Sequence, residues 1–208
     1  LLQGVRYNRS PMSGLNTPQQ EAVAYVGGPL LVLAGAGSGK TKVITEKIAH
    51  LIATGRHEAR HIAAITFTNK AAKEMRERVA KRVKGDAAEG LTISTFHSLG
   101  LRFLQIEHER AKLRRGFSIF DGDDQMAIIK DLATPGLKND ALYSIQNLIS
   151  AAKNNALSPE QAAEAARSGR EREAAGIYAR YQARLQAYNA VDFDDLIRLP
   201  LTLLEAEP

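Results

Sequence analysis

One stretch near the N-terminus decides the fold: residues 30–41 read LLVLAGAGSGKT. Its first four residues form a short apolar run of the kind found in a buried parallel strand. The glycines that follow permit backbone conformations in which successive N–H groups point toward one centre. Beyond the loop, apolar residues recur at helical spacing to about Thr54, where Gly55 is the expected C-cap. A strand, a glycine-rich turn and a helix in this order predict a phosphate-binding loop.

This loop predicts a site for ATP and Mg²⁺. The Lys40 ammonium would reach the β- and γ-phosphates, and the Thr41 hydroxyl would ligate the metal. The general pattern G-x-x-x-x-G-K-[ST] begins with glycine, whereas this chain has Ala34. The alternative is a glycine-rich structural turn. The expected nucleotide-binding residues of the loop are Ala34, Gly35, Ala36, Gly37, Ser38, Gly39, Lys40 and Thr41, with Lys40 and Thr41 in the catalytic role.

Two more strands are expected, at residues 62–67 and 91–96, where apolar and β-branched residues are dense. A helix over about 70–83, with Asn69 as its cap, separates them. The resulting β-α-β-α-β order predicts a parallel, doubly wound sheet that binds ligands at the carboxyl ends of its strands. The N-terminal helix is expected to run to about Tyr25.

Capping patterns and helical periodicity describe the rest of the chain. Thr17 is the expected N-cap of the first helix, with Pro18 at N1 and Gln20 at N3. After about residue 98 no further strand pattern appears, so the second part is expected to be all-helical. Its helices are expected near residues 98–110, 123–133, 141–155, 159–167, 171–189 and 194–206, and SPEQ at 158–161 repeats the capping signature.

Composition narrows the class of protein. The 208 residues carry a net charge of +5 and include no cysteine, which excludes disulfides, thiolate metal sites and a thiol nucleophile. No apolar run is long enough to span a membrane and no signal peptide is recognisable, so we expect a cytoplasmic protein without membrane contact. The histidines show no repeated ligand spacing, and we assign no transition metal. Residues 1–11 are interpreted as a cloning scar or a disordered leader.

The excess of basic residues lies within the first hundred positions. It is densest at residues 70–84, which suggests an anionic partner. The alternative is a solvated helix face, because Glu74–Arg78 and Glu77–Lys81 have the i,i+4 spacing of surface ion pairs. The basic residues concerned are Lys70, Lys73, Arg76, Arg78, Lys81, Arg82 and Lys84.

Five segments, in order, resemble the superfamily 1A DNA helicases of the UvrD/PcrA/Rep family. They read LNTPQQEAV (15–23), AGAGSGKT (34–41), ITFTNKAAKEM (65–75), TISTFHSLG (92–100) and VDFDDL (191–196). The resemblance covers about residues 13–208. It implies the first part of a RecA-like ATP-binding domain, 1A, over 12–98, a helical subdomain, 1B, over 99–190, and a return into domain 1A over 191–208.

The resemblance also implies roles for single residues. Gln19 matches the adenine-sensing glutamine of the family. The residues that match its single-stranded-DNA contacts are Phe67, Thr68, Asn69, Lys70, Thr95, Phe96 and His97. Aromatic faces stack on any base, and Asn, Thr and Lys side chains hold phosphates, so these residue types suit the role.

Each assignment has a plainer alternative on the residues alone. Gln19 would be a glutamine on a helix surface, Phe67 and Phe96 would be core residues at the ends of apolar strands, and His97 would be a loop histidine. Asp192, Asp194 and Asp195 resemble a carboxylate cluster, but they precede a helix, where acidic residues suit capping and the helix dipole. We interpret them as capping residues, not catalytic ones.

The family pattern continues into a D-E-x-Q-D motif, whose acids hold Mg²⁺ and orient the attacking water, and this sequence contains no such motif. We therefore expect the N-terminal ATP- and DNA-binding part of a 3′-5′ helicase that acts on single strands and single-strand/duplex junctions. The part itself is expected to be monomeric, with negligible turnover. The rivals are another P-loop NTPase, such as a small-molecule kinase, and a non-hydrolytic DNA-binding or protein-interaction module.

Overall fold

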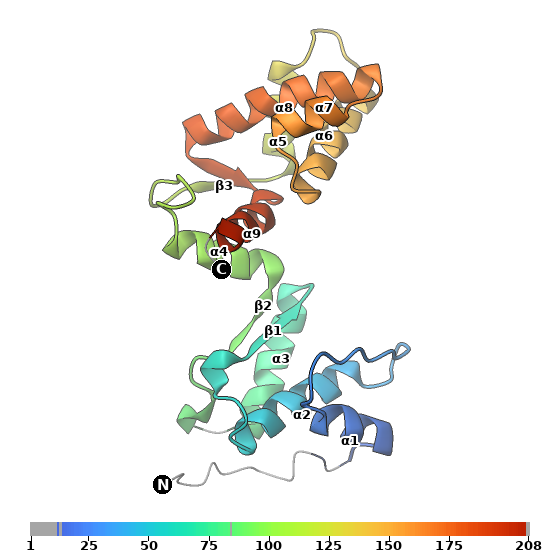
Figure 1. Cartoon of the computed structure of the whole chain (residues 1–208), viewed down its shortest axis with the longest axis vertical. Coiled ribbons are helices and arrows are strands. Elements are labelled where there is room, and N and C mark those ends of the chain that lie inside the picture. The colour runs from blue at the N-terminus through green and yellow to red at the C-terminus, as the bar shows by residue number, and fades with distance from the viewer. Residues whose placement is uncertain (1–11, 13, 84, 207–208) are drawn as a thin grey trace. The chain divides into compact units, whose positions relative to one another are not determined.

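The computed structural model describes residues 12, 14–83 and 85–206, which form two compact units (Figure 1). The first unit lies within residues 1–96 and the second within residues 97–208. The predicted leader at residues 1–11 lies outside the described residues. Among the described residues, no helix combines the length and the apolar character needed to cross a membrane.

The helices of the first unit start where polar side chains can cap them. Its elements are α1 (Thr17–Ala24), α2 (Lys40–Ala53), α3 (Asn69–Arg82) and the short 3-10 helices η1 (Ala59–His61) and η2 (Gly85–Ala88). The predicted cap of α1 is wrong by one position. Asn16 is the cap, and Gln19 at N3 returns the hydrogen bond to the Asn16 N–H, at 3.1 Å. The cap of α3 is likewise Thr68, whose Oγ1 accepts from Ala71 N at 3.1 Å.

The first unit contains a two-stranded parallel sheet. Its strands are β1 (Ala63–Thr66) and β2 (Thr92–Thr95), in a register that pairs Ala63 with Thr92 and Thr66 with Thr95. Two of the three predicted strands and their parallel pairing are therefore confirmed. Because the register is level, the two strands end side by side.

The third predicted strand, at residues 30–33, is not formed. Leu31 and Leu33 are 82% and 86% exposed, and the segment has no regular secondary structure. A strand needs a hydrogen-bonded neighbour as well as an apolar sequence. Among the described residues, no other strand pairs with this run.

The core of the first unit joins α2, α3 and the sheet. Ile48 of α2, Met75 and Val79 of α3, and Ile93 of β2 are buried together. The buried positions in the helices follow the helical period, and those in the strands follow the two-residue alternation. Each element therefore turns one apolar face toward the core.

The second unit begins in α4 (Phe96–Ile106), and five further helices follow among its described residues. They are α5 (Gly122–Leu132), α6 (Asn139–Asn154), α7 (Pro159–Ala165), α8 (Gly169–Tyr188) and α9 (Asp195–Ala206). All six predicted helices are confirmed to within a few residues. The SPEQ capping box is also confirmed, with Gln161 N donating to Ser158 Oγ at 3.2 Å.

The expectation of an all-helical second part is wrong. Strands β3 (Ser118–Phe120) and β4 (Ala190–Asp192) pair in parallel, with Phe120 opposite Asp192. Each strand has three residues, too few to show a two-residue period, and its partner lies about seventy positions away in the sequence. The pattern of either strand alone cannot reveal such a pairing.

Two apolar clusters hold the second unit together. The larger joins α5, α6 and α8 around Ile145, Tyr178 and Tyr181. The smaller includes Leu104 of α4, Val191 of β4 and Leu196 of α9. Residues 191–206 thus pack against the rest of the second unit, and their assignment to a RecA-like domain 1A stays a prediction.

Candidate nucleotide and nucleic-acid site

The phosphate loop leads directly into α2. Gly37 and Gly39 have φ of +74° and +83°, a left-handed backbone that a residue with a Cβ adopts only under strain. Gly39 is the N-cap of α2, and no side chain caps this end of the helix. The first N–H groups of a helix carry a partial positive charge, so this terminus suits an anion such as phosphate.

The Lys40 side chain folds back over the same loop. Its Nζ donates to Ala34 O at 3.0 Å and to Gly35 O at 2.7 Å, and Ser38 Oγ also donates to Gly35 O, at 2.7 Å. The loop therefore holds the ammonium group within its own curve, through carbonyl acceptors that phosphate oxygens can replace.

Gln19 connects α1 to the loop. Its Nε2 donates to Ser38 O at 3.0 Å, while its Oε1 accepts from Asn16 N. A Cβ added to Gly39 would lie 3.2 Å from Gln19 Nε2, so the side chain passes close over the glycine. Gln19, and not Gln20, is the capping residue at N3, and Gln20 instead donates to Leu15 O at 2.9 Å.

Thr41 lies half-buried in the first turn of α2, and its backbone oxygen accepts from Thr45 Oγ1 at 2.8 Å. The Lys42 Nζ donates to Gly14 O at 2.6 Å, which ties the start of α2 to the chain before α1. The predicted roles of the loop residues in binding ATP, and of Thr41 in binding Mg²⁺, stay predictions.

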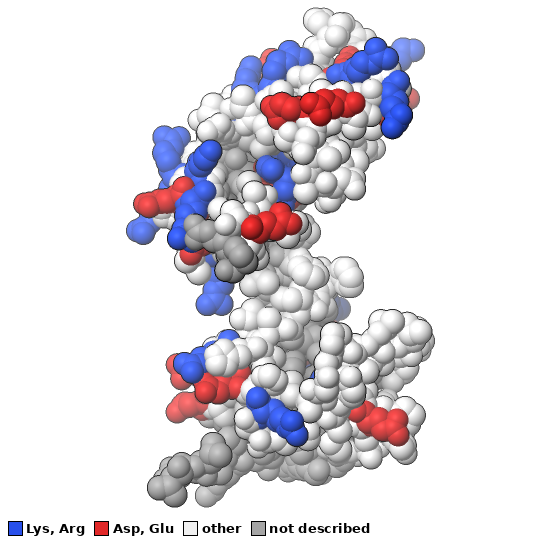
Figure 2. Space-filling model, viewed as in Figure 1, with Lys and Arg blue, Asp and Glu red and all other residues white. Residues whose placement is uncertain are grey.

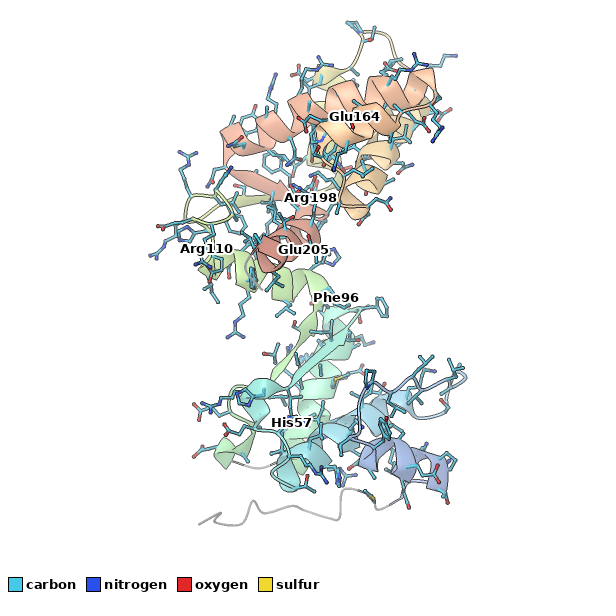
Figure 3. The ribbon with its side chains drawn as sticks, in the orientation of Figure 1. His57, Phe96, Arg110, Glu164, Arg198 and Glu205 are labelled. Atoms are coloured by element: carbon cyan, nitrogen blue, oxygen red, sulfur yellow. The ribbon has the colours of Figure 1, made fainter. Side chains whose placement is uncertain are left out.

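The two predicted DNA-contact segments meet at one edge of the first sheet. Phe67 follows β1 and Phe96 follows β2, and the level register of Thr66 with Thr95 brings these positions together. Phe67 is 94% exposed and Phe96 is 57% exposed. Figure 3 labels Phe96 where the chain passes from β2 into α4. The alternative interpretation of both rings as core residues is wrong.

The neighbouring polar residues differ in accessibility. Thr68 uses its hydroxyl to cap α3, whereas Asn69 and Lys70 are exposed at the start of that helix. Thr95 is buried at 6% exposure, so its side chain faces the interior in this conformation. His97 is exposed in the first turn of α4. Their predicted contacts with DNA stay predictions.

Some basic side chains of α3 make contacts within the first unit, and others are exposed. Arg76 Nη1 donates to Ile93 O at 2.6 Å, and Arg82 forms an ion pair with Glu46, which is only 1% exposed. Arg78 forms the predicted i,i+4 pair with Glu74, with 3.8 Å between nitrogen and oxygen. The exposed lysines that remain among the described residues are Lys70, Lys73 and Lys81. Lys84 lies outside the described residues.

A second group of basic side chains gathers over the loop between α4 and β3 (Figure 2). The loop carries Arg110, Lys112, Arg114 and Arg115, all exposed. The net charge of the second unit does not reveal this basic loop, because acidic residues elsewhere in the unit outweigh its local excess of positive charge.

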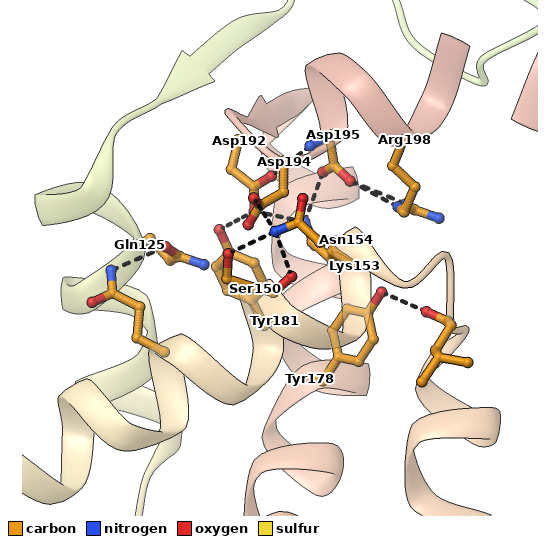
Figure 4. Close-up of polar contacts among 12 residues, drawn as sticks. Gln125, Ser150, Lys153, Asn154, Tyr178, Tyr181, Asp192, Asp194, Asp195 and Arg198 are labelled. Carbon is orange, nitrogen blue, oxygen red and sulfur yellow. Dashed lines mark hydrogen bonds and ion pairs between the residues drawn. The ribbon is translucent and has the colours of Figure 1, made fainter. Parts of the chain in front are cut away.

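Two aspartates of the VDFDDL segment, Asp192 and Asp195, lie in a buried network of opposite charges (Figure 4). Lys153 Nζ lies 2.6 Å from Asp192 Oδ2 and 2.9 Å from Asp195 Oδ2. Asp192 Oδ1 accepts from Asp195 N at 2.9 Å, which confirms the expected capping role for Asp192. Arg198 completes the charge balance by donating to Asp195 Oδ1 at 3.0 Å. Among the described residues, no three His, Asp or Glu side chains form a cluster that could hold a metal ion.

Two tyrosines of α8, Tyr178 and Tyr181, lie near this network, and burial raises the pKa of both. The Tyr181 hydroxyl donates to Asp192 Oδ2 at 2.8 Å, and the adjacent carboxylate adds to the effect. Burial raises the pKa of Tyr178 to about 12, and its hydroxyl donates to Leu157 O at 3.1 Å. Burial likewise raises the pKa of Asp194 above its usual value.

The sequence interpretation missed two residues of this region. Phe193 is 50% exposed, and its ring meets that of His97 edge to face, with 5.8 Å between centroids. The only signal for Phe193 in the sequence was an aromatic residue between two acidic residues in VDFDDL. Lys153 gave none, since a lysine on an amphipathic helix reads as a surface residue.

Comparison with known proteins identifies the family. The model of the UvrD/REP helicase N-terminal domain matches residues 15–208. The chain is 53% identical over 194 residues to ATP-dependent DNA helicase Rep of Escherichia coli K12, covering 92% of this chain and 29% of the relative. It is 42% identical over 200 residues to ATP-dependent DNA helicase PcrA of Bacillus subtilis 168, covering 95% of this chain and 27% of the relative. The chain thus spans less than a third of these curated relatives, and it belongs to the UvrD/REP helicase N-terminal domain family.

Proposed function

We propose that this chain is the ATP- and single-stranded-DNA-binding part of an ATP-dependent DNA helicase. The proposal rests on the combination of two features in the first unit. One is the N-terminus of α2, which no side chain caps and which begins with Lys40, and the other is a pair of exposed aromatic rings where the two paired strands end. The relatives named above are ATP-dependent DNA helicases, which supports the same function. Translocation in the 3′ to 5′ direction and unwinding at single-strand/duplex junctions rest on the family resemblance.

The nucleotide would bind across the loop of residues 34–41. Backbone N–H groups at the start of α2 would donate hydrogen bonds to phosphate oxygens, and Lys40 Nζ would donate to those oxygens in place of its two carbonyl partners. Thr41 would be a ligand of Mg²⁺, which neutralises phosphate charge when bound. Gln19 lies against Ser38 and would contact the base from α1.

Single-stranded DNA would bind along the strand ends. Phe67 and Phe96 offer exposed faces on which bases of any sequence can stack, and Asn69 and Lys70 would hold phosphates beside them. Phe193 and His97 offer a second aromatic pair in the other unit. Because phosphate contacts release counterions, the affinity should fall as the salt concentration rises.

We propose the domain map 12–98, 99–190 and 191–208 for the RecA-like part, the inserted subdomain and the return. Hydrolysis would depend on acids of the D-E-x-Q-D type, which this sequence does not contain. The 208-residue chain would then bind nucleotide and DNA weakly, as a cytoplasmic monomer, with little turnover.

The test measures ATP turnover and binding of fluorescent ATP by the 208-residue chain, with and without oligothymidylate. Lys40→Ala should abolish nucleotide binding, whereas the control Lys42→Ala, two positions further along α2, should retain it. Phe67→Ala should weaken binding of oligothymidylate. Robust turnover that depends on Lys40 would contradict the expectation of an inactive part. Binding of DNA that ignores both ATP and the Lys40 change would favour a non-hydrolytic DNA-binding module.

A further inference from the structure

The second unit buries a lysine between two aspartates. Lys153 lies near the end of α6 with a side chain that is 0% exposed. Taking an ammonium and two carboxylates out of water costs several kcal/mol per ion, and apolar side chains of similar size would stabilise a fold at least as well. The position of this charge therefore calls for a role beyond stability.

Capping of α9 does not explain the network. A cap requires one carboxylate oxygen, and Asp192 Oδ1 supplies it to the Asp195 N–H. The second oxygen, Asp192 Oδ2, receives Lys153 at 2.6 Å and the Tyr181 hydroxyl at 2.8 Å. Lys153 also lies over the Tyr181 ring, 5.1 Å from its centroid, and reaches Asp195. These contacts connect the start of α9 to α6 and α8.

The contacts enclose a two-residue turn, Phe193 and Asp194. Asp194 is held separately, because Asn154 Nδ2 donates to its Oδ1 at 3.2 Å. All three residues of β4 are buried, and Phe193 is the first exposed residue after the strand. The ring is half exposed and meets His97 edge to face.

The partner ring is placed by a close approach of two helices. A Cβ on Gly100 of α4 would lie 1.8 Å from Leu196 O of α9, so the glycine lets the helices come near enough for His97 to reach Phe193. The His97–Phe193 contact therefore depends on α4, on α9 and on the turn that Lys153 holds.

We infer that Lys153 is a positioning residue, which holds the Phe193 turn so that Phe193 and His97 together form a stacking surface for a DNA base. The inference rests on the proposed DNA-binding function. Lys153 itself touches no DNA, and its effect passes through the ring of Phe193.

The test uses two changes that release the turn and one matched control. Lys153→Met with Asp192→Asn removes one positive and one negative charge together, so that Asp195 keeps its pair with Arg198. Tyr181→Phe removes one buried hydroxyl that bonds to Asp192. The control Tyr178→Phe removes a buried hydroxyl of the same helix that bonds to Leu157 instead.

The first readout needs no DNA: nuclear Overhauser contacts between the His97 and Phe193 rings in the 208-residue chain. They should weaken in both turn variants and persist in Tyr178→Phe. Persistence in the turn variants, or equal loss in the control, would overturn the inference. This readout decides the positioning step even if the chain binds no DNA, an outcome that would contradict the proposed function alone.

The second readout is the affinity for fluorescein-labelled oligothymidylate, measured with Phe193 and again with Phe193→Ala. Each turn variant should weaken binding about 5-fold to 150-fold when Phe193 is present, the range that one base–aromatic stack supplies. Neither should add a further loss in the Phe193→Ala background. Equal losses in both backgrounds would show a merely structural role and would reject the inference.

Discussion

The two units each contain a parallel sheet of two strands, and in both an exposed aromatic residue follows a strand end. In the first, Phe67 and Phe96 follow β1 and β2, and the local support is a helix cap from Thr68. In the second, Phe193 follows β4, and a buried network of charges around Lys153 holds the turn.

The difference shows two ways of holding the same kind of surface. The cap of α3 is local, because Thr68 and Ala71 are three residues apart. In the Lys153 network, by contrast, Lys153 and Asp192 are 39 positions apart, and the network depends on the packing of three helices. A surface held by local contacts should tolerate single changes, whereas one held by buried charges should lose its geometry when one partner is removed.

The largest effect should come from breaking the buried network. Lys153→Met leaves two buried carboxylates without their shared cation, so we expect the second unit to lose about 3–5 kcal/mol of unfolding free energy. Urea unfolding followed by tyrosine fluorescence measures it. Lys130→Met, at an exposed position of α5, is the control and should change little. Equal stability of the two variants would contradict the prediction, because it would mean that removing Lys153 leaves no unpaired charge on the buried aspartates.

The next effect sharpens the comparison within the first unit. Ile93 lies buried in β2, whereas Leu33 lies in the apolar run that forms no strand. Ile93→Ala should cost about 2–5 kcal/mol, since it leaves a cavity. Leu33→Ala should stay within about 0.5 kcal/mol, as for other exposed positions. Urea unfolding of the 208-residue chain compares them, and a large loss for Leu33→Ala would show that this run is buried in solution.

A smaller effect should follow from removing the local support of the first sheet. Thr68→Ala deletes the cap of α3 and should cost about 1 kcal/mol. Thr68→Ser keeps a hydroxyl oxygen at the cap and should recover most of the loss. If Thr68→Ser is as destabilising as Thr68→Ala in thermal unfolding, the cap is not what holds the start of α3.

The last effect concerns pH and arises only above pH 10. Tyr178 has a pKa of about 12 when folded, against 10.0 when unfolded, so only the unfolded state ionises in that interval. Its contribution is fully present below pH 10 and is lost as the pH rises toward 12, because the unfolded state binds fewer protons. The urea midpoint should therefore fall less steeply above pH 10 in Tyr178→Phe than in the unchanged chain. Parallel slopes would contradict the raised pKa.

Much of the fold could be predicted from local patterns. The helices, two of the strands and the SPEQ cap follow from periodicity and capping chemistry over a few residues. The predicted caps of α1 and α3 were each wrong by one position, because in both places an Asn and a Thr are neighbours and either residue is a good cap. Patterns of this kind identify an element better than they identify its first residue.

The candidate site divides in the same way. The phosphate loop was predictable because its chemistry lies in eight consecutive residues at a helix start. The exposure of Phe67 and Phe96 was not, since apolar strand ends read equally well as core. Lys153 could not be found, because nothing around residue 153 indicates that Asp192 and Asp195 lie beside it.

By itself, the sequence determined the helices, the loop before α2 and the family, because these depend on residues close together along the chain. The tertiary structure alone decided that β3 pairs with β4, that residues 30–33 form no strand and that Lys153 forms ion pairs with two aspartates. The physical reason is that burial, strand pairing and charge compensation depend on partners distant in the sequence. Only packing brings those partners within range.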